Sequence, residues 1–274
     1  MQLNEYHFPL TVRYGETGFN GVATLPALAN WLQEAAGQSA NELGFGEPFM
    51  TPLHLGWILS RLALRILRLP RAGEELLVKT WPSTLDHLGH RGYEVYDEED
   101  RLIVSGSSAW AIMDFRTRHM GRVPTELAAV YPKDPRPCLP FCARTLPRLQ
   151  ESDAMCRDML RVRRDDLDIN GHVNNARYLA WLTEALPVVQ DADMVPAFLD
   201  ISYRAETFPA DELDSLCAVA EDSNMLRQAA AQYQELFSDA APVQQGIVHS
   251  IKRRDGAEGT EVCRALSLWR HPLL

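Results

Sequence analysis

The sequence predicts an α+β fold made of two related halves, each with an antiparallel sheet and one long helix. Three observations support this prediction. A segment near the start of the chain recurs about halfway along it, a proline-rich stretch separates the two copies, and each copy has one amphipathic helix followed by several strands. The 274 residues are 46% hydrophobic and 23% charged, which is ordinary for a globular protein with a large core.

Two blocks of sequence recur in the same order, which is the mark of an internal duplication. At an offset of 150 residues, Asn20-Gly21-Val22 lies on Asn170-Gly171-His172, and residues 31–35 lie on 181–185 with Trp, Leu, Glu and Ala in common. At an offset of 139, Arg65 lies on Arg204 and Pro70 on Pro209. The change of offset predicts about eleven extra residues in the first copy, near 44–54.

The segment between the copies, Tyr131 to Arg148, contains five prolines. Proline has no backbone N–H and is excluded from helix interiors and central strands, so this segment is expected to be a largely extended connector. The chain is therefore predicted to consist of an N-terminal domain over residues 1–130, a linker over 131–148 and a C-terminal domain over 149–274.

The first copy begins with a predicted strand over Tyr6 to Tyr14, followed by a polar turn and a helix. Thr24 is the expected N-cap of this helix, Pro26 lies in its first turn, and apolar residues recur on one face. Strands over 93–96 and 102–105 then flank an acidic hairpin tip.

The second copy repeats this order. A strand over Met159 to Arg164 precedes a helix that is expected to start near Asn174 and to stop at Pro187, and strands over 247–251 and 262–268 follow. One helix followed by long antiparallel strands in about 130 residues is typical of the hot-dog fold. Two copies predict a tandem, or double, hot-dog, in which one chain supplies a pseudo-dimer; a further homodimer stays open.

Composition and charge exclude several classes of protein. The apolar stretch from Leu55 to Leu69 is interrupted by three arginines, so no membrane span is expected, and a net charge of −10 argues against nucleic acid as a partner. Residues 1–5 lack the features of a secretory signal, and the five scattered cysteines form no CxxC pair. These observations predict free thiols in a reducing cytoplasm.

A polar motif lies immediately before the second helix. Asp168, Asn170 and His172 alternate in an extended turn, which predicts that the three side chains point to one side, near the backbone N–H groups of the helix start. A titratable imidazole, a carboxylate and backbone donors suit catalysis at a carbonyl group. The first copy has Gly18 and Val22 in place of Asp168 and His172, so folding does not require these side chains.

Glu206 is a fourth candidate. If residues 201–206 form a strand, Ser202, Arg204 and Glu206 lie on one face, where Glu206 could simply pair with Arg204. The offset of 139 gives Leu67 as the counterpart of Glu206, so the carboxylate, like Asp168 and His172, is present in one copy. This pattern predicts a single active site in the second copy.

The sequence resembles the acyl-acyl carrier protein thioesterases of plants and bacteria over nearly the whole chain. The resemblance is carried by residues 166–181, which begin Asp166-Leu167-Asp168 and contain the string Asp-x-Asn-x-His-Val-Asn-Asn, and by residues 32–36 and 57–61 of the first copy. It implies a double hot-dog that hydrolyses the thioester joining a fatty acyl chain to carrier protein. The implied catalytic set is Asp168, Asn170, His172 and Glu206. Many plant members have Cys after the glutamate, where this chain has Thr207, which argues against a thiol nucleophile.

Substrate contacts are expected in both copies. The first copy is expected to hold the acyl chain, with Trp31, Leu32, Ala35 and Trp57 as candidates, although core packing explains such residues more often than ligand contact does. Asn174 and Asn175 are candidate substrate contacts that are also suited to turns and caps. Acyl carrier protein is acidic, so docking is expected on basic residues of the less acidic first half, and the candidates are Arg61, Arg65, Arg68, Arg71 and Lys79.

Three alternatives share parts of this pattern. An acyl-CoA thioesterase would use the same chemistry on a different carrier, a hot-dog hydratase would use His and Asp without Glu206, and a non-catalytic acyl-thioester sensor would need no polar set. The sequence contains no glycine-rich phosphate loop and no His/Cys cluster at metal-binding spacing, so neither a cofactor nor a metal is predicted.

Overall fold

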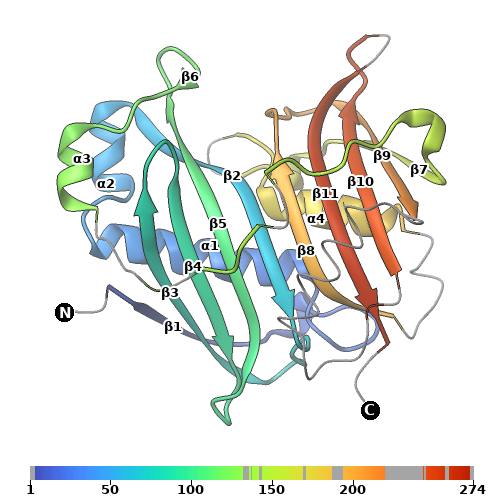
Figure 1. Cartoon of the computed structure of the whole chain (residues 1–274), viewed down its shortest axis with the longest axis horizontal. Coiled ribbons are helices and arrows are strands. Elements are labelled where there is room, and N and C mark those ends of the chain that lie inside the picture. The colour runs from blue at the N-terminus through green and yellow to red at the C-terminus, as the bar shows by residue number, and fades with distance from the viewer. Residues whose placement is uncertain are drawn as a thin grey trace. The chain divides into compact units, whose positions relative to one another are not determined.

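Two units of related structure make up the chain, unit 1 (Met1–Pro140) and unit 2 (Phe141–Leu274). The computed structural model in Figure 1 describes residues 4–131, 136, 138–141, 144–168, 171–186, 194–219, 243, 245–256 and 259–271. The boundary between the units falls inside the predicted linker. The residues of that linker that the structure describes contain no helix or strand, as the prolines predict.

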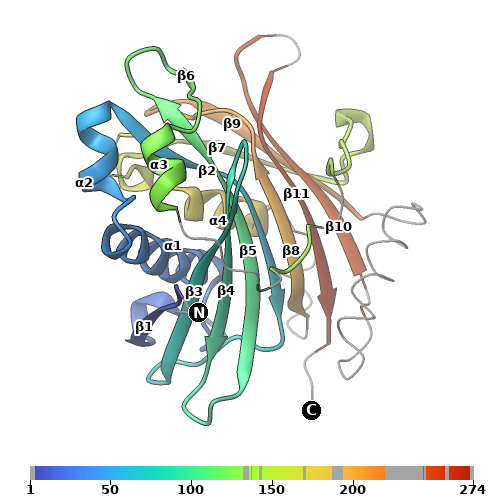
Figure 2. The same ribbon diagram turned by 60° about the vertical axis from the view of Figure 1, so that its left-hand side comes forward.

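Unit 1 is an antiparallel sheet with helix α1 packed on one face, as Figure 2 shows. The strand order is β1-β3-β4-β5-β2, with the short β6 paired to β5. Its elements are β1 (Tyr6–Thr11), η1 (Tyr14–Glu16), α1 (Leu25–Glu42), α2 (Glu47–Met50), η2 (Thr51–Leu53), β2 (Leu55–Ile66), β3 (Glu75–Leu85), β4 (Gly89–Tyr96), β5 (Leu102–Asp114), β6 (His119–Met120) and α3 (Thr125–Val130).

Unit 2 repeats this arrangement with the strand order β7-β9-β10-β11-β8 and helix α4 packed against β9 and β10. Its elements are η3 (Glu151–Asp153), β7 (Cys156–Arg161), η4 (Arg164–Asp166), α4 (Asn175–Glu184), β8 (Val195–Tyr203), β9 (Glu212–Val219), β10 (Gln245–Arg253) and β11 (Thr260–Arg270). The α+β tandem hot-dog fold that the sequence predicts is therefore confirmed.

Helix α1 forms where the sequence predicts it. The hydroxyl of Thr24 accepts a hydrogen bond from the backbone N–H of Ala27 at 3.2 Å, and Pro26 lies in the first turn. Leu28, Leu32 and Ala35 lie on the buried face of this helix. The first strand, by contrast, ends at Thr11 rather than at Tyr14, because the one-turn 3-10 helix η1 begins at Tyr14.

Matching backbone hydrogen bonds confirm the duplication before each helix. The N–H of Gly18 donates to the carbonyl of Val22 at 2.9 Å, and 150 residues later the N–H of Asp168 donates to the carbonyl of His172 at 2.7 Å. Gly21 and Gly171 both have positive φ values, 74° and 75°, in these turns. The described residues of the two turns therefore match in backbone hydrogen bonding and in the φ of the glycine, although their side chains differ.

After the helices the predicted offset of 139 is wrong, and the structural offset is 137. Gly73 N–H donates to the carbonyl of Val12 and Ala210 N–H to that of Val162, at 2.9 and 3.2 Å, and both donors have positive φ, 87° and 70°. The counterpart of Glu206 is therefore Leu69, not Leu67. The prolines 70 and 209 match in sequence but are not structurally equivalent, because the first copy has thirteen rather than eleven extra residues, which include α2 and η2.

A buried hydrogen-bonded triad also occurs once in each unit, on the sheet face toward the helix. In unit 1, Ser108 Oγ lies 3.0 Å from Tyr93 Oη and 2.7 Å from Trp110 Nε1. In unit 2, Ser267 Oγ lies 2.8 Å from His249 Nε2 and 2.8 Å from Trp269 Nε1. The tryptophan donates to the serine in both units, whereas a titratable imidazole replaces the tyrosine in unit 2.

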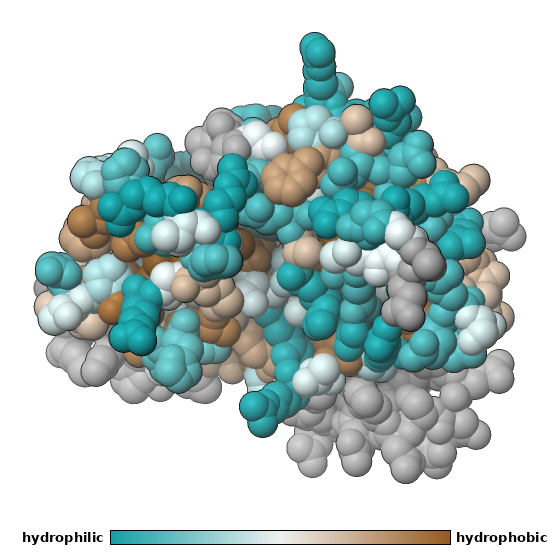
Figure 3. All heavy atoms as spheres, turned by 90° about the horizontal axis from the view of Figure 1, so that it is seen from above, coloured by the Kyte–Doolittle hydropathy of each residue, from teal (hydrophilic) through white to brown (hydrophobic). Residues whose placement is uncertain are grey.

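The surface is mainly polar where it is seen from above in Figure 3, with hydrophobic side chains scattered among hydrophilic ones. Single exposed apolar side chains, of which Tyr14 and Phe19 are the most exposed, are ordinary in globular proteins. None of the helices that the structure describes is long and apolar enough to cross a membrane.

The buried imidazole predicts a pH dependence of stability. Burial lowers the pKa of His249 from 6.5 to about 3, so the folded protein keeps this group neutral while the unfolded chain protonates it near pH 6.5. Its contribution is fully present above pH 6.5 and is lost as the pH falls toward 3. The free energy of unfolding should fall by up to about 1.4 kcal/mol per pH unit in this window.

Urea denaturation of wild type and His249→Gln between pH 7 and pH 4 measures this contribution. The variant should be less stable at pH 7 but should lose less stability on acidification. His119→Gln, at an exposed position on β6, is the control and should keep the wild-type profile. A variant His249→Gln with the wild-type slope would contradict the assignment.

Candidate active site

The turn that carries His172 is closed by its own backbone. The N–H of Asp168 donates to the carbonyl of His172 at 2.7 Å, and Asp168 Oδ1 accepts from the backbone N–H of His172 at 3.3 Å. Gly171 has a positive φ of 75°, which glycine adopts without strain. These contacts fix the position of His172 immediately before α4. The predicted site residue Asn170 lies outside the residues that the structure describes.

Glu206 and His172 meet at the start of α4. His172 Nδ1 lies 3.8 Å from Glu206 Oε1, and the two side chains are 18% and 29% exposed. The edge of the Phe208 ring faces the imidazole, with ring centroids 5.8 Å apart at 80°. Two of the predicted catalytic side chains are therefore neighbours in a half-buried position that water can reach.

The prediction that Glu206 lies on a strand is wrong. Strand β8 ends at Tyr203, and the N–H groups of Arg204 and Ala205 both point to the carbonyl of Val262, at 2.9 and 3.4 Å, which ends the regular ladder. Glu206 lies in the loop that follows. Arg204, which the sequence offered as a partner of Glu206, pairs with Glu261 at 3.1 Å. Strand alternation therefore does not determine the position of Glu206.

Long-range contacts that sequence reasoning missed hold this loop. Arg253 donates to the carbonyl oxygen of Glu206 at 2.9 Å and is itself held by Asp255 at 2.8 Å. The hydroxyl groups of Thr207 and Tyr178 are hydrogen-bonded, and burial raises the pKa of Tyr178, which keeps the phenol protonated. Tyr178 lies within residues 166–181, the stretch that carries the family resemblance, whereas no sequence pattern pointed to Arg253.

The start of helix α4 supplies a positive electrostatic end next to His172. Several of its backbone donors are engaged: Val173 N–H with the carbonyl of Thr207 at 3.4 Å, Asn174 N–H with that of Asp166 at 2.8 Å, and Ala176 N–H with Asn174 Oδ1 at 2.9 Å. Asn174 is the N-cap of α4, as its residue type suggests. Its amide oxygen therefore has a structural role in addition to any substrate contact.

The same turn in unit 1 lacks the polar side chains. Val22 occupies the place of His172, Gly18 that of Asp168 and Leu69 that of Glu206, while the backbone of the turn is preserved. Asn20 Oδ1 accepts from the N–H of Val22 at 3.3 Å, which is a turn contact. The duplicated fold thus forms without a carboxylate–imidazole pair, and the pair in unit 2 is available for chemistry.

The candidate acyl-chain residues lie in two separate places of unit 1. Trp31, Leu32 and Ala35 are on the buried face of α1, and Trp31 Nε1 donates to Glu16 at 2.9 Å. Trp57 on β2 packs instead with the rings of Phe45 and Tyr131, with both centroids at 6.3 Å. The larger apolar cluster around Trp57 comprises Ala40, Phe45, Met50, Ile112, Leu127 and Tyr131.

The candidate docking residues do not form one surface. Arg65 and Lys79 share one face of the sheet, because Arg65 pairs with Ser105, Ser105 with Glu94, and Glu94 with Lys79. Arg61 lies on the same face farther along β2. Arg68 instead binds Glu74 at 2.8 Å and the buried Asp97 at 2.7 Å. Burial raises the pKa of Asp97, but the hydrogen bonds from Arg68 and Arg101 outweigh it and lower that pKa to about 2. Arg71 is exposed.

Within the residues that the structure describes, no group of three or more His, Cys, Asp or Glu side chains is arranged to hold a metal ion.

Comparisons with known proteins identify the family. The sequence profile of the acyl-ACP thioesterase N-terminal domain matches residues 4–131, and that of the C-terminal domain matches residues 149–271. Oleoyl-acyl carrier protein thioesterase 1 of Arabidopsis thaliana and oleoyl-acyl carrier protein thioesterase of Coriandrum sativum, both chloroplastic, are 28% and 29% identical to this chain. Each alignment covers 97% of this chain and 76% of the relative.

Solved structures show the same fold. An acyl-ACP thioesterase from Bacteroides thetaiotaomicron superposes with a TM-score of 0.79 at 24% identity, over 97% of this chain and 98% of that one. The 12:0-ACP thioesterase from Umbellularia californica superposes with a TM-score of 0.80 at 24% identity, over 98% and 94% of the two chains.

Two hot-dog units, each matched by a domain profile of acyl-ACP thioesterases, define a thioester hydrolase of the tandem hot-dog class. The chain belongs to the acyl-ACP thioesterase family, whose two domain profiles together match nearly all of it. The family resemblance inferred from the motif is therefore confirmed, and so is the main prediction of an enzyme that hydrolyses fatty acyl-ACP thioesters.

The cap at Asn174 gives a prediction that separates a structural role from a substrate contact. Asn174→Ala should lower the free energy of unfolding by about 1 kcal/mol, because the N–H of Ala176 loses its partner. Asn174→Ser should restore most of this stability. If activity returns with stability in the Ser variant, the residue acts as a cap; activity lost in both variants, with stability restored in Ser, would show a substrate contact instead.

Proposed function

We propose that this enzyme releases a free fatty acid and holo-carrier protein from fatty acyl-ACP by direct attack of water on the thioester. One observation supports the mechanism most strongly. His172 Nδ1 and Glu206 Oε1 lie 3.8 Å apart at the start of α4, and the sister unit has Val22 and Leu69 in their places. The carboxylate of Glu206, the imidazole of His172 and the positive end of α4 therefore lie around one half-buried position in unit 2.

The separation of 3.8 Å is too long for a direct hydrogen bond but suits two groups that hold one water molecule between them. In the proposed step, Glu206 accepts a proton as the water oxygen bonds to the thioester carbon. The oxyanion forms near the positive end of α4. The C–S bond then breaks, the carboxylic acid is released, and the departing sulfur receives a proton from the Glu206–His172 pair, which returns to its starting state.

Asp168 and Asn170 support this pair in the proposal. Asp168 Oδ1 binds the backbone N–H of His172, so in the proposal it positions the imidazole through the turn. Asn170 is proposed to help stabilise the oxyanion, and Asn175 to contact the substrate at the helix start.

A thiol nucleophile is disfavoured by the state of the cysteines. Thr207 occupies the position after Glu206, and its hydroxyl is hydrogen-bonded to Tyr178. Burial raises the pKa of Cys217 to about 12 and that of Cys263 well above its ordinary value, so both thiols stay protonated at neutral pH. Water activated by Glu206 and His172 therefore remains the best-supported nucleophile.

The proposed partner is acyl carrier protein with its fatty acyl phosphopantetheine thioester, and the proposed acyl site lies in unit 1 near Trp57. We further propose a place in fatty acid biosynthesis in the cytoplasm; all four cysteines that the structure describes are free thiols, as expected in a reducing compartment. Identification of the free fatty acids released in a bacterial host tests the activity and reports the chain length.

The catalytic pair gives a direct kinetic prediction. His172→Ala and Glu206→Gln should each lower kcat on acyl-ACP by at least roughly a hundredfold, because general-base assistance is commonly worth about 10² to 10⁴. Steady-state kinetics on a purified acyl-ACP measures this, with circular dichroism to show that the fold is kept. Glu184→Gln, an exposed acid at the end of α4, is the matched control and should keep normal turnover. Near-normal kcat in both site variants would remove the assignment.

Carrier docking on unit 1 can be tested at Arg71. Because Arg68 holds the buried Asp97, its reversal would disturb folding, whereas the exposed Arg71 can be reversed without that effect. Arg71→Glu should raise the KM for acyl-ACP several-fold at low salt with kcat little changed, as expected for electrostatic attraction of an acidic partner. An unchanged KM at low salt would count against docking there.

A further inference from the structure

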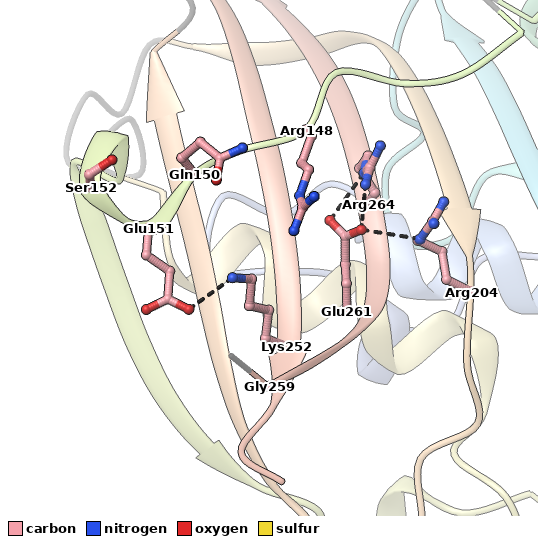
Figure 4. A pocket seen from close by; sticks show the side chains of 9 residues that line it. All are labelled: Arg148, Gln150, Glu151, Ser152, Arg204, Lys252, Gly259, Glu261 and Arg264. Atoms are coloured by element: carbon pink, nitrogen blue, oxygen red, sulfur yellow. Dashed lines mark hydrogen bonds and ion pairs between the residues drawn. The ribbon is translucent and has the colours of Figure 1, made fainter. Parts of the chain in front are cut away.

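A polar pocket of about 640 Å³ lies on the sheet of unit 2 (Figure 4), and its lining contains neither His172 nor Glu206. The hydroxyl of Tyr203 donates to the carbonyl of Asn175 on α4, so Tyr203 lies on the sheet face toward the helix. Cys263 pairs with Tyr203 and shares that face. The next residue, Arg264, therefore points to the opposite face of the sheet. The pocket is formed between this face and the chain segment before β7. Its lining residues are Arg148, Gln150, Glu151, Ser152, Arg204, Lys252, Gly259, Glu261 and Arg264.

Positive charge exceeds negative charge in the lining. Glu261 is bound by Arg264 and by Arg204, the latter at 3.1 Å, and Glu151 is bound by Lys252 at 2.8 Å. Burial raises the pKa of Glu261, but hydrogen bonds from Arg264 and Ser250 outweigh it; the hydrogen bond from Lys252 lowers the pKa of Glu151. Both carboxylates are ionised at neutral pH. Two carboxylates against four cationic groups leave a net charge of about two positive units.

The frame of the pocket is fixed while two of its cations face the open space. Arg264 is 6% exposed and donates to the carbonyl of Leu146 at 2.9 Å, which ties the segment before β7 to β11. Arg148 extends from this segment toward β10 and β11 in Figure 4, and among the described residues it has no ion-pair partner. Arg204 uses Nε for Glu261, which leaves its terminal nitrogens as further donors.

The sister unit shows that the fold does not need these charges. The strand registers place Tyr96 where unit 2 has Lys252, Leu102 where it has Glu261, and Ser105 where it has Arg264; the backbone bonds after β2 and β8 place Leu67 opposite Arg204. None of the four counterparts is charged. The same face of the sister sheet does carry charges, since Arg65 and Glu94 flank Ser105, but they stand at other register positions. The four positions that line the pocket are therefore charged in unit 2 and uncharged in unit 1.

We infer that this pocket binds the phosphate group of an anionic ligand, with Arg148 and Arg204 as the principal donors. Arginine guanidinium groups match the geometry of phosphate oxygens through paired N–H donors. The lining contains no large apolar side chain, so it suits a small polar anion rather than an acyl chain. This inference does not rest on the proposed hydrolysis, because phosphate binding is measured without a substrate.

The pocket is connected to the catalytic loop through the chain. Arg204 lies two residues before Glu206, and Lys252 is followed by Arg253, which holds the carbonyl of Glu206. Two sources of phosphate fit the same chemistry: free phosphate or a small phosphate ester, and the phosphodiester of the prosthetic arm on the carrier protein.

Isothermal titration of the full chain with inorganic phosphate tests the site. Arg148→Gln and Arg204→Gln should each weaken binding by about tenfold or more, since each removes a charge-assisted hydrogen-bond donor. Arg161→Gln removes an exposed arginine of β7 outside the pocket and should leave binding unchanged. Absence of phosphate binding by the wild type, or equal affinity in all three variants, would overturn the inference.

Kinetics then distinguish the two sources. If the arm supplies the phosphate, Arg148→Gln should raise the KM for acyl-ACP about tenfold but leave that for the same acyl group on pantetheine, which lacks phosphate, unchanged. If free phosphate is the ligand, neither KM should change in phosphate-free buffer. Failure of the wild type to hydrolyse either thioester would remove the proposed function and leave the phosphate titration intact, so the two ideas can fail separately.

Discussion

One backbone hydrogen bond joins the two segments that carry His172 and Glu206, the proposed catalytic pair. Val173 N–H, directly after His172, donates to the carbonyl of Thr207, directly after Glu206, at 3.4 Å. The corresponding bond in unit 1, from Ala23 to the carbonyl of Pro70, measures 2.7 Å. Because this contact uses main-chain atoms alone, it persists whatever side chains flank it. The distance between imidazole and carboxylate therefore depends on a feature of the fold itself.

Duplication gives this fold an internal comparison. The two sheets share strand order, register and left-handed glycines before their helices. Before the helix, however, unit 2 has His172 next to Glu206, whereas unit 1 has Val22 and Leu69 at the equivalent places. The same comparison applies to the basic pocket on the other face of the unit 2 sheet. In the proposed mechanism the chain has one reaction centre, in unit 2.

The sequence was informative where structure is determined locally. Thr24 and Asn174 cap their helices because capping involves residues two or three positions apart, and the duplication was visible because the turns before both helices need the same backbone. The offset after the helices was misjudged because two prolines match in sequence, whereas the extra residues are accommodated by α2 and η2. The end of the insertion depends on how α2 and η2 pack, which a short sequence pattern does not predict.

The sequence predicted the residues of the candidate site but not the contacts that hold them in place. His172 and Glu206 could be named from a motif and a difference between copies, but the loop position of Glu206 follows from the end of β8 at Tyr203. Arg253 and Tyr178 reach the loop from β10 and α4, at 47 and 29 residues' separation. Contacts of this length depend on strand register, which a single sequence does not specify.

The positive φ of Ala210 has a consequence for how the catalytic loop evolved. Unit 1 has Gly73 at the equivalent place, where a φ of 87° is free of strain, but unit 2 holds an alanine at 70°. A non-glycine residue in this region is disfavoured by about 1 kcal/mol or more. Glycine would relieve that strain, yet it would also widen the range of conformations open to the unfolded loop. Alanine thus narrows the unfolded ensemble of the segment after Glu206 relative to that of its sister loop, which offsets part of the strain in the folded state.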